Sequence, residues 1–189
     1  MKITPVFHGL DLLASDLVRS PGLHVSHIYN DLFEMLEPSR YKADGVINPV
    51  MTAMGTAWEK HLEYLLHKAG VPVFRPGELV TPEGIAYSPD GLLDNNTRLA
   101  EYKVAWWMSS ADMPRSETSS FPPKLDKYVC QMQSYAHHLE LSCARLYVLF
   151  VQGPGRNPEL LVYDIEFTPR ELRENWQALL NHARHRRML

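Results

Sequence analysis

The sequence predicts an α/β protein with a central mixed sheet flanked by helices. Three observations lead to this prediction. Segments with helical periodicity alternate with short apolar runs, turn-forming residues separate these runs, and the run at 145–152 is apolar almost throughout, as in a central strand buried on both faces. The expected order is two helices, about three strands, a helix, two strands and a final helix, which places one sheet between helical layers.

Two helices are expected in the first third of the chain. The first covers 26–36. The second covers 49–69, where Asn48 is a good N-cap, Pro49 occupies the first helical position and Gly70 follows the end. Apolar residues at helical spacing mark the inward face of each helix. They are Ile28, Leu32, Phe33 and Leu36 in the first helix, and Val50, Met54, Ala57, Trp58, Leu62, Leu65 and Leu66 in the second.

Strands are expected in the middle of the chain. A short strand at 71–74 precedes two apolar runs, 84–93 and 98–105, which turn-forming residues at 94–97 join into a hairpin. The Ser- and Pro-rich stretch 108–124 has no periodicity, and loops of that length are typically functional or mobile.

A helix, two strands and a last helix complete the predicted fold. The helix covers 125–139, and strands follow at 145–152 and 160–167. The last helix begins at a capping box, Thr168–Glu171, with Pro169 at its first position. The inward positions are Leu125, Tyr128, Met132, Tyr135 or Ala136, and Leu139 in the earlier helix, and Leu172, Trp176, Leu179 and Leu180 in the last.

Length and composition are those of one globular domain, 1–189. The apolar share is 45%, the charged share is 22%, and no apolar run approaches the roughly 18 residues of a membrane span. The N-terminus lacks a signal-peptide pattern and the two cysteines are too few for a disulfide framework, so a cytoplasmic location is expected. The net charge of −3 argues against a non-specific nucleic-acid binder, but a metal-dependent nuclease carries carboxylates of its own.

Three charged side chains in the predicted hairpin suit phosphodiester hydrolysis. Side chains alternate across a strand, so Glu101 and Lys103 share one face, and pairing of the two strands brings Asp90 close to that face. Two carboxylates are hard oxygen ligands for Mg²⁺ or Mn²⁺, and a lysine beside them orients water or neutralises developing charge. Taken alone, the same residues also fit a solvated turn and a charged strand face.

Polar residues on two of the predicted helices extend this pattern. Glu59 and Glu63 lie one turn apart on the second helix, where they form a solvated acidic face or, through Glu59, supply a third carboxylate for the metal. Gln131 and Tyr135 lie one turn apart on the third helix, and Gln133 lies on another side of it.

The order of these motifs resembles that of a known nuclease family. The motifs are Gly55-x-x-x-Glu59, Ser88-Pro89-Asp90-Gly91, Glu101-x-Lys103 and Gln131-x-Gln133, preceded by Arg19 and Ser26 seven residues apart. In this order the sequence resembles the lambda-type exonucleases, also called alkaline or YqaJ-like phage exonucleases, of the PD-(D/E)xK nuclease superfamily. The resemblance spans residues 19–152. It implies the restriction-endonuclease-like core of that superfamily.

The resemblance implies a metal-binding role for several residues. Asp90, Glu101 and the backbone carbonyl of Tyr102 would hold divalent ions, with Glu59 as a further ligand. Lys103 would position or polarise the attacking water. The implied cofactor is Mg²⁺, as two ions, with Mn²⁺ as a substitute.

Other residues are implied to support the site or to bind the end of the DNA strand. Either Gln131 or Gln133 would support the site by hydrogen bonding, and the sequence does not separate them. Arg19, Ser26 and Ser88 would form a pocket for the 5′-phosphate of the strand being cut. Ser26 also fits an ordinary helix N-cap.

The implied reaction is 5′→3′ digestion of one strand of linear double-stranded DNA in phage-type recombination. It leaves a 3′ single strand for a single-strand annealing protein. The family also implies a homotrimer. The expected location is the cytoplasm of a bacterial or phage-infected cell, and no membrane partner is expected. His24 and Tyr102 depart from the family pattern, where Thr and an aliphatic residue are usual. The alternatives are an endonuclease or a single-strand exonuclease on the same core, and a non-catalytic DNA-binding module.

Overall fold

A mixed four-stranded sheet lies at the centre of the protein. The computed structural model describes residues 20–41, 49–105, 109–117, 120–151 and 158–189. The sheet order is β3–β4–β5–β6, and these strands cover Gly91–Leu93, Arg98–Ala105, Cys143–Phe150 and Glu159–Glu166. β4 and β5 are parallel, whereas the two outer pairs are antiparallel. The predicted mixed sheet is therefore confirmed, and the most apolar run lies in an inner strand, β5.

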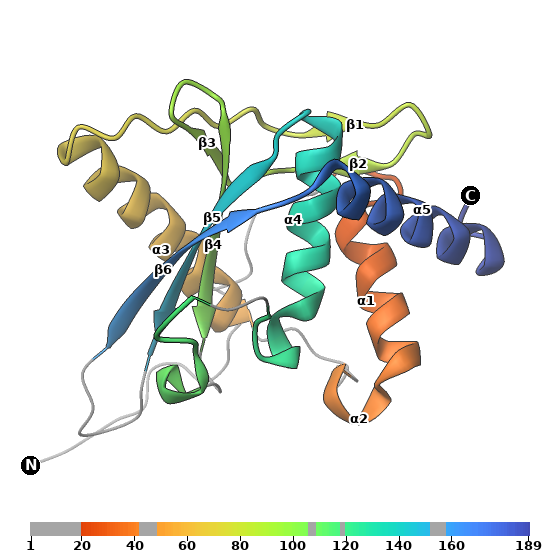
Figure 1. Ribbon diagram of the computed structural model, residues 1–189, viewed down its shortest axis with the longest axis horizontal. Coiled ribbons are helices and arrows are strands. Elements are labelled where there is room, and N and C mark those ends of the chain that lie inside the picture. The colour runs from red at the N-terminus through yellow and green to blue at the C-terminus, as the bar shows by residue number, and fades with distance from the viewer. Residues whose placement is uncertain (1–19, 42–48, 106–108, 118–119, 152–157) are drawn as a thin grey trace, which may run out of the picture.

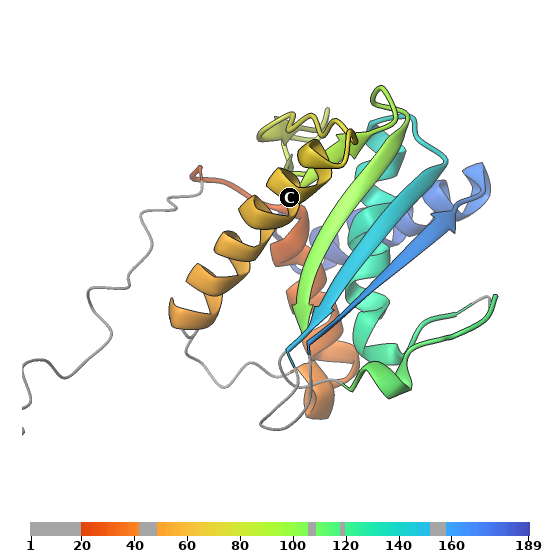
Figure 2. The ribbon, with the colours of Figure 1, turned by 90° about the vertical axis from the view of Figure 1, so that its left-hand side faces the viewer.

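Helices cover both faces of this sheet (Figures 1 and 2). α3 (Pro49–Lys68) lies against one face, and α4 (Asp126–His138) lies against the other. α1 (Val25–Leu36) and α5 (Pro169–His185) pack against α4, and a single turn, α2 (Pro38–Tyr41), follows α1. No helix in the described parts of the chain combines the length and the apolar character that crossing a bilayer requires.

Alternation along β4 divides the apolar core between the two faces of the sheet. Leu99 belongs to a large cluster shared with α1, α4 and α5, whereas Ala100 and Tyr102 belong to a smaller cluster under α3. This is the alternation that the sequence predicts for the strand. It leaves Glu101 and Lys103 on the α4 face, at the border of the large cluster.

The strands before β4 differ from those predicted. No strand forms at 71–74, where Phe74 makes an isolated bridge to β3. The run at 84–93 is split into two strands, because Pro89 lacks the N–H that a continuous strand would donate. Its first part pairs with a two-residue strand that is too short to leave a periodic pattern. These two paired strands are β1 (Leu79–Val80) and β2 (Ala86–Tyr87).

The predicted helices are confirmed to within one residue at the bounds of α1, α3 and α4, but their buried faces are narrower than predicted. In α3, Leu62 is buried, whereas Met54 and Leu65 are 48% and 40% exposed. The reason is that α3 covers only the part of the sheet near β4. In α1, Leu36 is 61% exposed and Val25 is buried instead. The predicted N-cap Asn48 and the side chain of Val50, a predicted inward residue, lie outside the described part of the chain.

The ends of the helices follow their sequence signals. Gly70 has a φ of +78° directly after α3, a backbone conformation that glycine adopts without strain. At the start of α5, the Thr168 hydroxyl accepts the Glu171 N–H at 3.2 Å, and the Glu171 carboxylate accepts the Thr168 N–H at 2.7 Å, as predicted for a capping box. The predicted loop before α4 contains two short 3₁₀ turns, Ser110–Asp112 and Pro123–Leu125.

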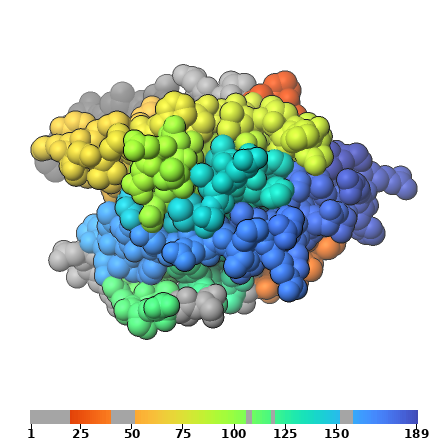
Figure 3. All heavy atoms as spheres, turned by 45° about the horizontal axis from the view of Figure 1, so that its top comes forward, coloured from red at the N-terminus to blue at the C-terminus, as the bar shows by residue number. Residues whose placement is uncertain are grey.

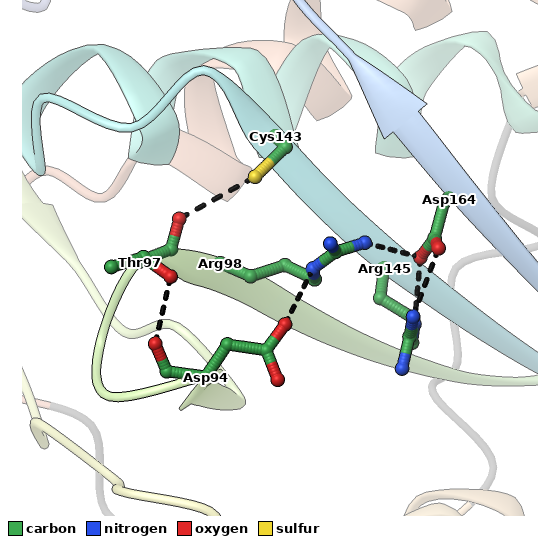
Figure 4. Close-up of polar contacts among 6 residues, drawn as sticks. All are labelled: Asp94, Thr97, Arg98, Cys143, Arg145 and Asp164. Atoms are coloured by element: carbon green, nitrogen blue, oxygen red, sulfur yellow. Dashed lines mark hydrogen bonds and ion pairs between the residues drawn. The ribbon is translucent and has the colours of Figure 1, made fainter.

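Ion pairs fix the β3–β4 turn and the start of β4 (Figure 4). Residues 94–96 all have positive φ, between 51° and 68°, which Asn and Asp tolerate better than most side chains. Arg98 contacts Asp94 at 2.9 Å within this turn and Asp164 of β6 at 2.7 Å. Arg145 of β5 binds the same Asp164 carboxylate at 2.6 and 2.9 Å. In Figure 3 this turn (bright green) lies beside the segment that follows α3 (yellow to yellow-green) and the α4–β5 connection (cyan).

Candidate active site

The middle of β4 places a carboxylate and an amine side by side. Glu101 Oε1 lies 2.5 Å from Lys103 Nζ, and the Glu101 side chain is 1% exposed whereas that of Lys103 is 23% exposed. From α4, Gln131 directs Nε2 toward the same carboxylate oxygen at 3.5 Å. Burial and these contacts hold the Glu101 carboxylate in one position.

Asp90 reaches the same strand because the hairpin stops pairing just before β3. Gly91 pairs with Ala100, so if the antiparallel pairing continued by two more residues, Pro89 would lie opposite Tyr102. Proline has no N–H to donate there. The Asp90 carboxylate lies at this position instead, and its Oδ2 accepts the Tyr102 N–H at 2.8 Å. Because the N–H and C=O of one residue leave the same edge of a strand, the Tyr102 carbonyl faces this edge as well.

Gly91 leaves room for the side chains that pack under α3. A Cβ at Gly91 would lie 2.6 Å from Val73 Cγ1 and 3.4 Å from the Tyr102 hydroxyl, both in the cluster under α3. We expect Gly91→Ala to destabilise the protein by about 1–3 kcal/mol, because overpacking a filled core displaces side chains and backbone. Urea unfolding measures the change. Gly55→Ala is the control, because a Cβ there meets no atom within 4 Å; equal midpoints for the wild type and Gly91→Ala would contradict the prediction.

The surroundings of the Glu101 carboxylate disfavour its charge. Burial, followed by the nearby carboxylate of Asp90 and more weakly that of Glu59, raises the pKa of Glu101 to about 8, although Lys103 opposes the shift. The Glu101 Oε2 atom is buried and has no hydrogen-bond partner among the described residues. A buried oxygen without a donor is unfavourable, and a divalent cation bound at this oxygen would remove the cost.

The oxygen atoms at this edge of β4 suit a hard divalent cation. Asp90 and Glu101 offer carboxylates and Tyr102 offers a carbonyl, which are the donors that Mg²⁺ and Mn²⁺ prefer. Glu59 lies on the α3 side, and burial and then the charge of Asp90 raise the pKa of its carboxyl. In the described ranges, no three His, Cys, Asp or Glu side chains are arranged to hold a metal ion by themselves. Backbone oxygen and water would therefore complete the coordination, and Glu59 as a ligand stays a prediction.

Two cations balance these carboxylates. Burial opposes the charge of Lys103, but Glu101 and neighbouring acidic groups outweigh it and raise the pKa of the ammonium. On the α3 side, Arg75 Nε donates to Glu63 Oε2 at 2.6 Å, and Arg75 Nη1 lies 3.9 Å from Glu59 Oε2. Glu63 therefore contacts this arginine. Sequence reasoning missed Arg75, which lies in an irregular segment that carries no motif.

The glutamine that contacts the site is Gln131. Its Nε2 also donates to the Tyr135 hydroxyl at 2.7 Å, one helical turn later. Tyr135 is buried, and burial and then the charge of Glu101 raise the pKa of its hydroxyl. Gln133 lies about 200° around α4 from Gln131 and so on another side of the helix. The supporting roles of both glutamines stay predictions, and the sequence pattern alone had not connected Tyr135 to the site.

Two of the three residues predicted to bind a 5′-phosphate lie on neighbouring segments. Arg19 lies outside the described residues. His24, the N-cap of α1, forms a parallel bridge with Ala86, so Ser26 and Ser88 each lie two residues beyond this bridge. Ser26 is inside the helix, so its alternative reading as the N-cap is wrong. The N-terminus of a 12-residue helix beside Ser88 is a favourable place for an anion.

Comparison with known proteins relates the fold to exonucleases. No protein-family model and no curated protein matches the sequence. The structure is similar to an alkaline exonuclease, LHK-Exo, from Laribacter hongkongensis, with a TM-score of 0.52 and 20% identity over 87% of this chain and 89% of that chain. LHK-Exo in complex with dAMP gives a TM-score of 0.55 and 17% identity, covering 87% of each chain.

A solved structure of another exonuclease has a similar fold. A phage-related exonuclease from Haemophilus somnus 129PT matches with a TM-score of 0.55 and 12% identity, covering 87% of this chain and 92% of that chain. At these identities the likeness concerns the fold. The chain therefore has the α/β fold of phage-related alkaline exonucleases, as the sequence predicts.

Proposed function

We propose that the protein is a Mg²⁺-dependent exonuclease that digests one strand of linear double-stranded DNA in the 5′→3′ direction. The observation that carries this proposal is the convergence of Asp90, Glu101 and Lys103 around the middle of β4, in a fold shared with exonucleases. When bound, two Mg²⁺ ions, or Mn²⁺ in their place, supply charge neutralisation at the phosphate and an activated water.

The residues around the middle of β4 have two proposed roles, metal binding and donation by Lys103. Asp90, Glu101 and the Tyr102 carbonyl would hold the ions, and Glu59 would add a ligand from the side of α3. Lys103 carries a positive charge at neutral pH because the acidic groups around it raise its pKa. Its ammonium donates to the attacking water or to a phosphate oxygen, where negative charge develops during cleavage.

The preference for a 5′-phosphate tests the proposed end-binding pocket. We expect Arg19→Ala and Ser88→Ala each to reduce the preference for a 5′-phosphate over a 5′-hydroxyl by about tenfold, because each removes a donor to a charged group. Ser26 at the start of α1 is proposed as the third donor. Rates on end-labelled duplexes that differ only in the 5′ group measure the effect. Arg170→Ala, an exposed arginine of α5, is the control, and an unchanged preference in Arg19→Ala would rule out the pocket.

Substrate form separates this function from its alternatives. We expect linear duplex to be degraded with Mg²⁺ and to stay intact with a chelator. Cleavage of closed circular DNA would indicate an endonuclease, and degradation of single strands alone would indicate a single-strand exonuclease. DNA binding without cleavage in either Mg²⁺ or Mn²⁺ would indicate a non-catalytic module.

The proposed reaction also suggests a biological setting. Removing one strand of a linear duplex leaves a 3′ single strand, which a single-strand annealing protein would use in phage-type recombination. A homotrimer is the oligomeric state proposed for the active protein. Light scattering of the purified protein measures its mass in solution and tests this state.

A further inference from the structure

Besides Glu101 of β4, Lys103 contacts an uncharged residue of α4, Tyr128. The Lys103 Nζ atom lies 5.0 Å from the centre of the Tyr128 ring, so the ammonium contacts an aromatic ring as well as Glu101. Tyr128 precedes Gln131 by three residues, which places both on one side of α4. One helix therefore contacts both members of the Glu101–Lys103 pair: Gln131 contacts Glu101, and Tyr128 contacts Lys103.

The two partners of Lys103 respond differently to a metal ion. A divalent cation bound at Glu101 offsets the carboxylate charge and repels the ammonium, so it weakens the ion pair. The attraction between an ammonium and a ring depends on the quadrupole of the ring, which the cation leaves in place. Tyr128 is also partly buried and packs against the main apolar core, which restricts the movement of its ring. It offers Lys103 a contact that persists when metal binds.

We propose that Tyr128 is a positioning residue, whose ring holds the Lys103 ammonium at the metal-binding edge of β4 during cleavage. This inference rests on the proposed function and extends it, because it assigns the orientation of Lys103 to a residue of α4. If Tyr128 served only to fill space, another large apolar side chain would replace it without loss. A second lysine, Lys127, has its Nζ 5.1 Å from the centre of the same ring and provides a comparison.

Three substitutions separate the effect of the ring from that of packing. Tyr128→Leu keeps an apolar side chain but removes the ring, and we expect kcat on linear duplex to fall about tenfold, or about 1.4 kcal/mol in the barrier, with little change in KM. Tyr128→Phe keeps the ring and is expected to recover kcat to within about threefold of wild type. Lys127→Met removes the other cation and is expected to keep kcat within about twofold. Thermal unfolding checks that each variant is folded.

NMR of the metal-free protein tests the contact without catalysis. Protons above an aromatic ring resonate upfield, so the ¹³C-labelled ε-methylene of Lys103 is expected upfield of those of other lysines. Lys103→Met assigns the signal, and Lys127→Met identifies the signal of the neighbouring lysine. We expect Tyr128→Leu to abolish the upfield shift, and we expect Tyr128→Phe and added Mg²⁺ to preserve it.

The outcomes distinguish this inference from the proposed function. Equal kcat for Tyr128→Leu and the wild type would overturn the inference, as would a Tyr128→Phe variant as slow as Tyr128→Leu. An upfield Lys103 signal that survives Tyr128→Leu would overturn it as well. A folded wild-type protein that cleaves no DNA with Mg²⁺ or Mn²⁺ would contradict the proposed function instead. The Lys103 signal would then still decide whether Tyr128 holds the ammonium.

Discussion

Glu101→Gln will remove Mg²⁺-dependent cleavage of linear duplex DNA, with a fall in kcat of about a thousandfold or more. Glutamine keeps the size of the side chain, but it lacks the negative charge that binds a divalent ion. Because Glu101 is buried between β4 and α4, water cannot easily substitute for its carboxylate. Asp90→Asn is expected to cause a similar fall, because Asp90 lies at the same edge of β4. Single-turnover cleavage of end-labelled duplex at saturating Mg²⁺ measures both.

Glu174→Gln is the matched control for this prediction. Glu174 is an exposed glutamate of α5 that pairs with Arg170 at 2.7 Å, so its substitution removes the same charge and one ion pair away from β4. We expect this variant to cleave at the wild-type rate. Calorimetric titration with Mg²⁺ gives a second readout, because Glu101→Gln should lose the binding heat that Glu174→Gln retains. Cleavage by Glu101→Gln at the wild-type rate would remove the metal-binding role of Glu101.

The faces of β4 could be predicted from the sequence, whereas the geometry of its edge could not. Strict alternation over 98–105 places Glu101 and Lys103 on one face whatever the neighbouring strands do. The position of Asp90 depends on where the hairpin stops pairing. Pro89 signals that a strand is interrupted, but the resulting contact between Asp90 and the Tyr102 N–H needs the register of the folded hairpin.

The sequence pattern did not show how packing would expose some side chains and bring others to the site. Arg75 reaches the site from an irregular segment, and only the fold sets it opposite Glu63 of α3. Met54 and Leu65 were predicted to be buried because they continue an apolar stripe, but α3 covers too little of the sheet to bury the whole stripe. Likewise, the pattern of α4 placed Tyr128 inward without showing that it would meet an ammonium group from β4.

The metal-free protein is expected to lose stability as the pH rises toward 8, chiefly through Glu101. The ordinary pKa of this carboxyl is 4.5, and burial, with nearby acidic groups, raises it to about 8 in the folded protein. Between these values, unfolding releases a proton, so each increase in pH favours the unfolded chain. The stabilisation is fully present below the ordinary pKa and is lost as the pH passes the folded pKa. The total change is on the order of 5 kcal/mol.

The difference between the wild type and Glu101→Gln isolates this contribution. The raised pKa of Glu59 acts in the same direction and the lowered pKa of His138 acts in the opposite one, but both groups are present in the two proteins. Urea unfolding with a chelator, from about pH 5 to about pH 9, measures the free energy of unfolding of both proteins. As the pH rises, this free energy should increase for the variant relative to the wild type. Parallel stability curves would mean that Glu101 is not held neutral by its surroundings.

Mg²⁺ should reverse this loss of stability in the wild type alone. At about pH 9 the folded wild-type protein holds an ionised Glu101, and a cation that binds only the folded state stabilises it by mass action. Glu101→Gln lacks this ligand, so added Mg²⁺ should leave its unfolding midpoint nearly unchanged. The Mg²⁺ affinity of the wild type should also rise with pH up to about 8, because below that value the ion must displace a proton from Glu101. Calorimetry in two buffers of different ionisation heat counts that proton, and an affinity that does not vary with pH would place the metal away from this carboxylate.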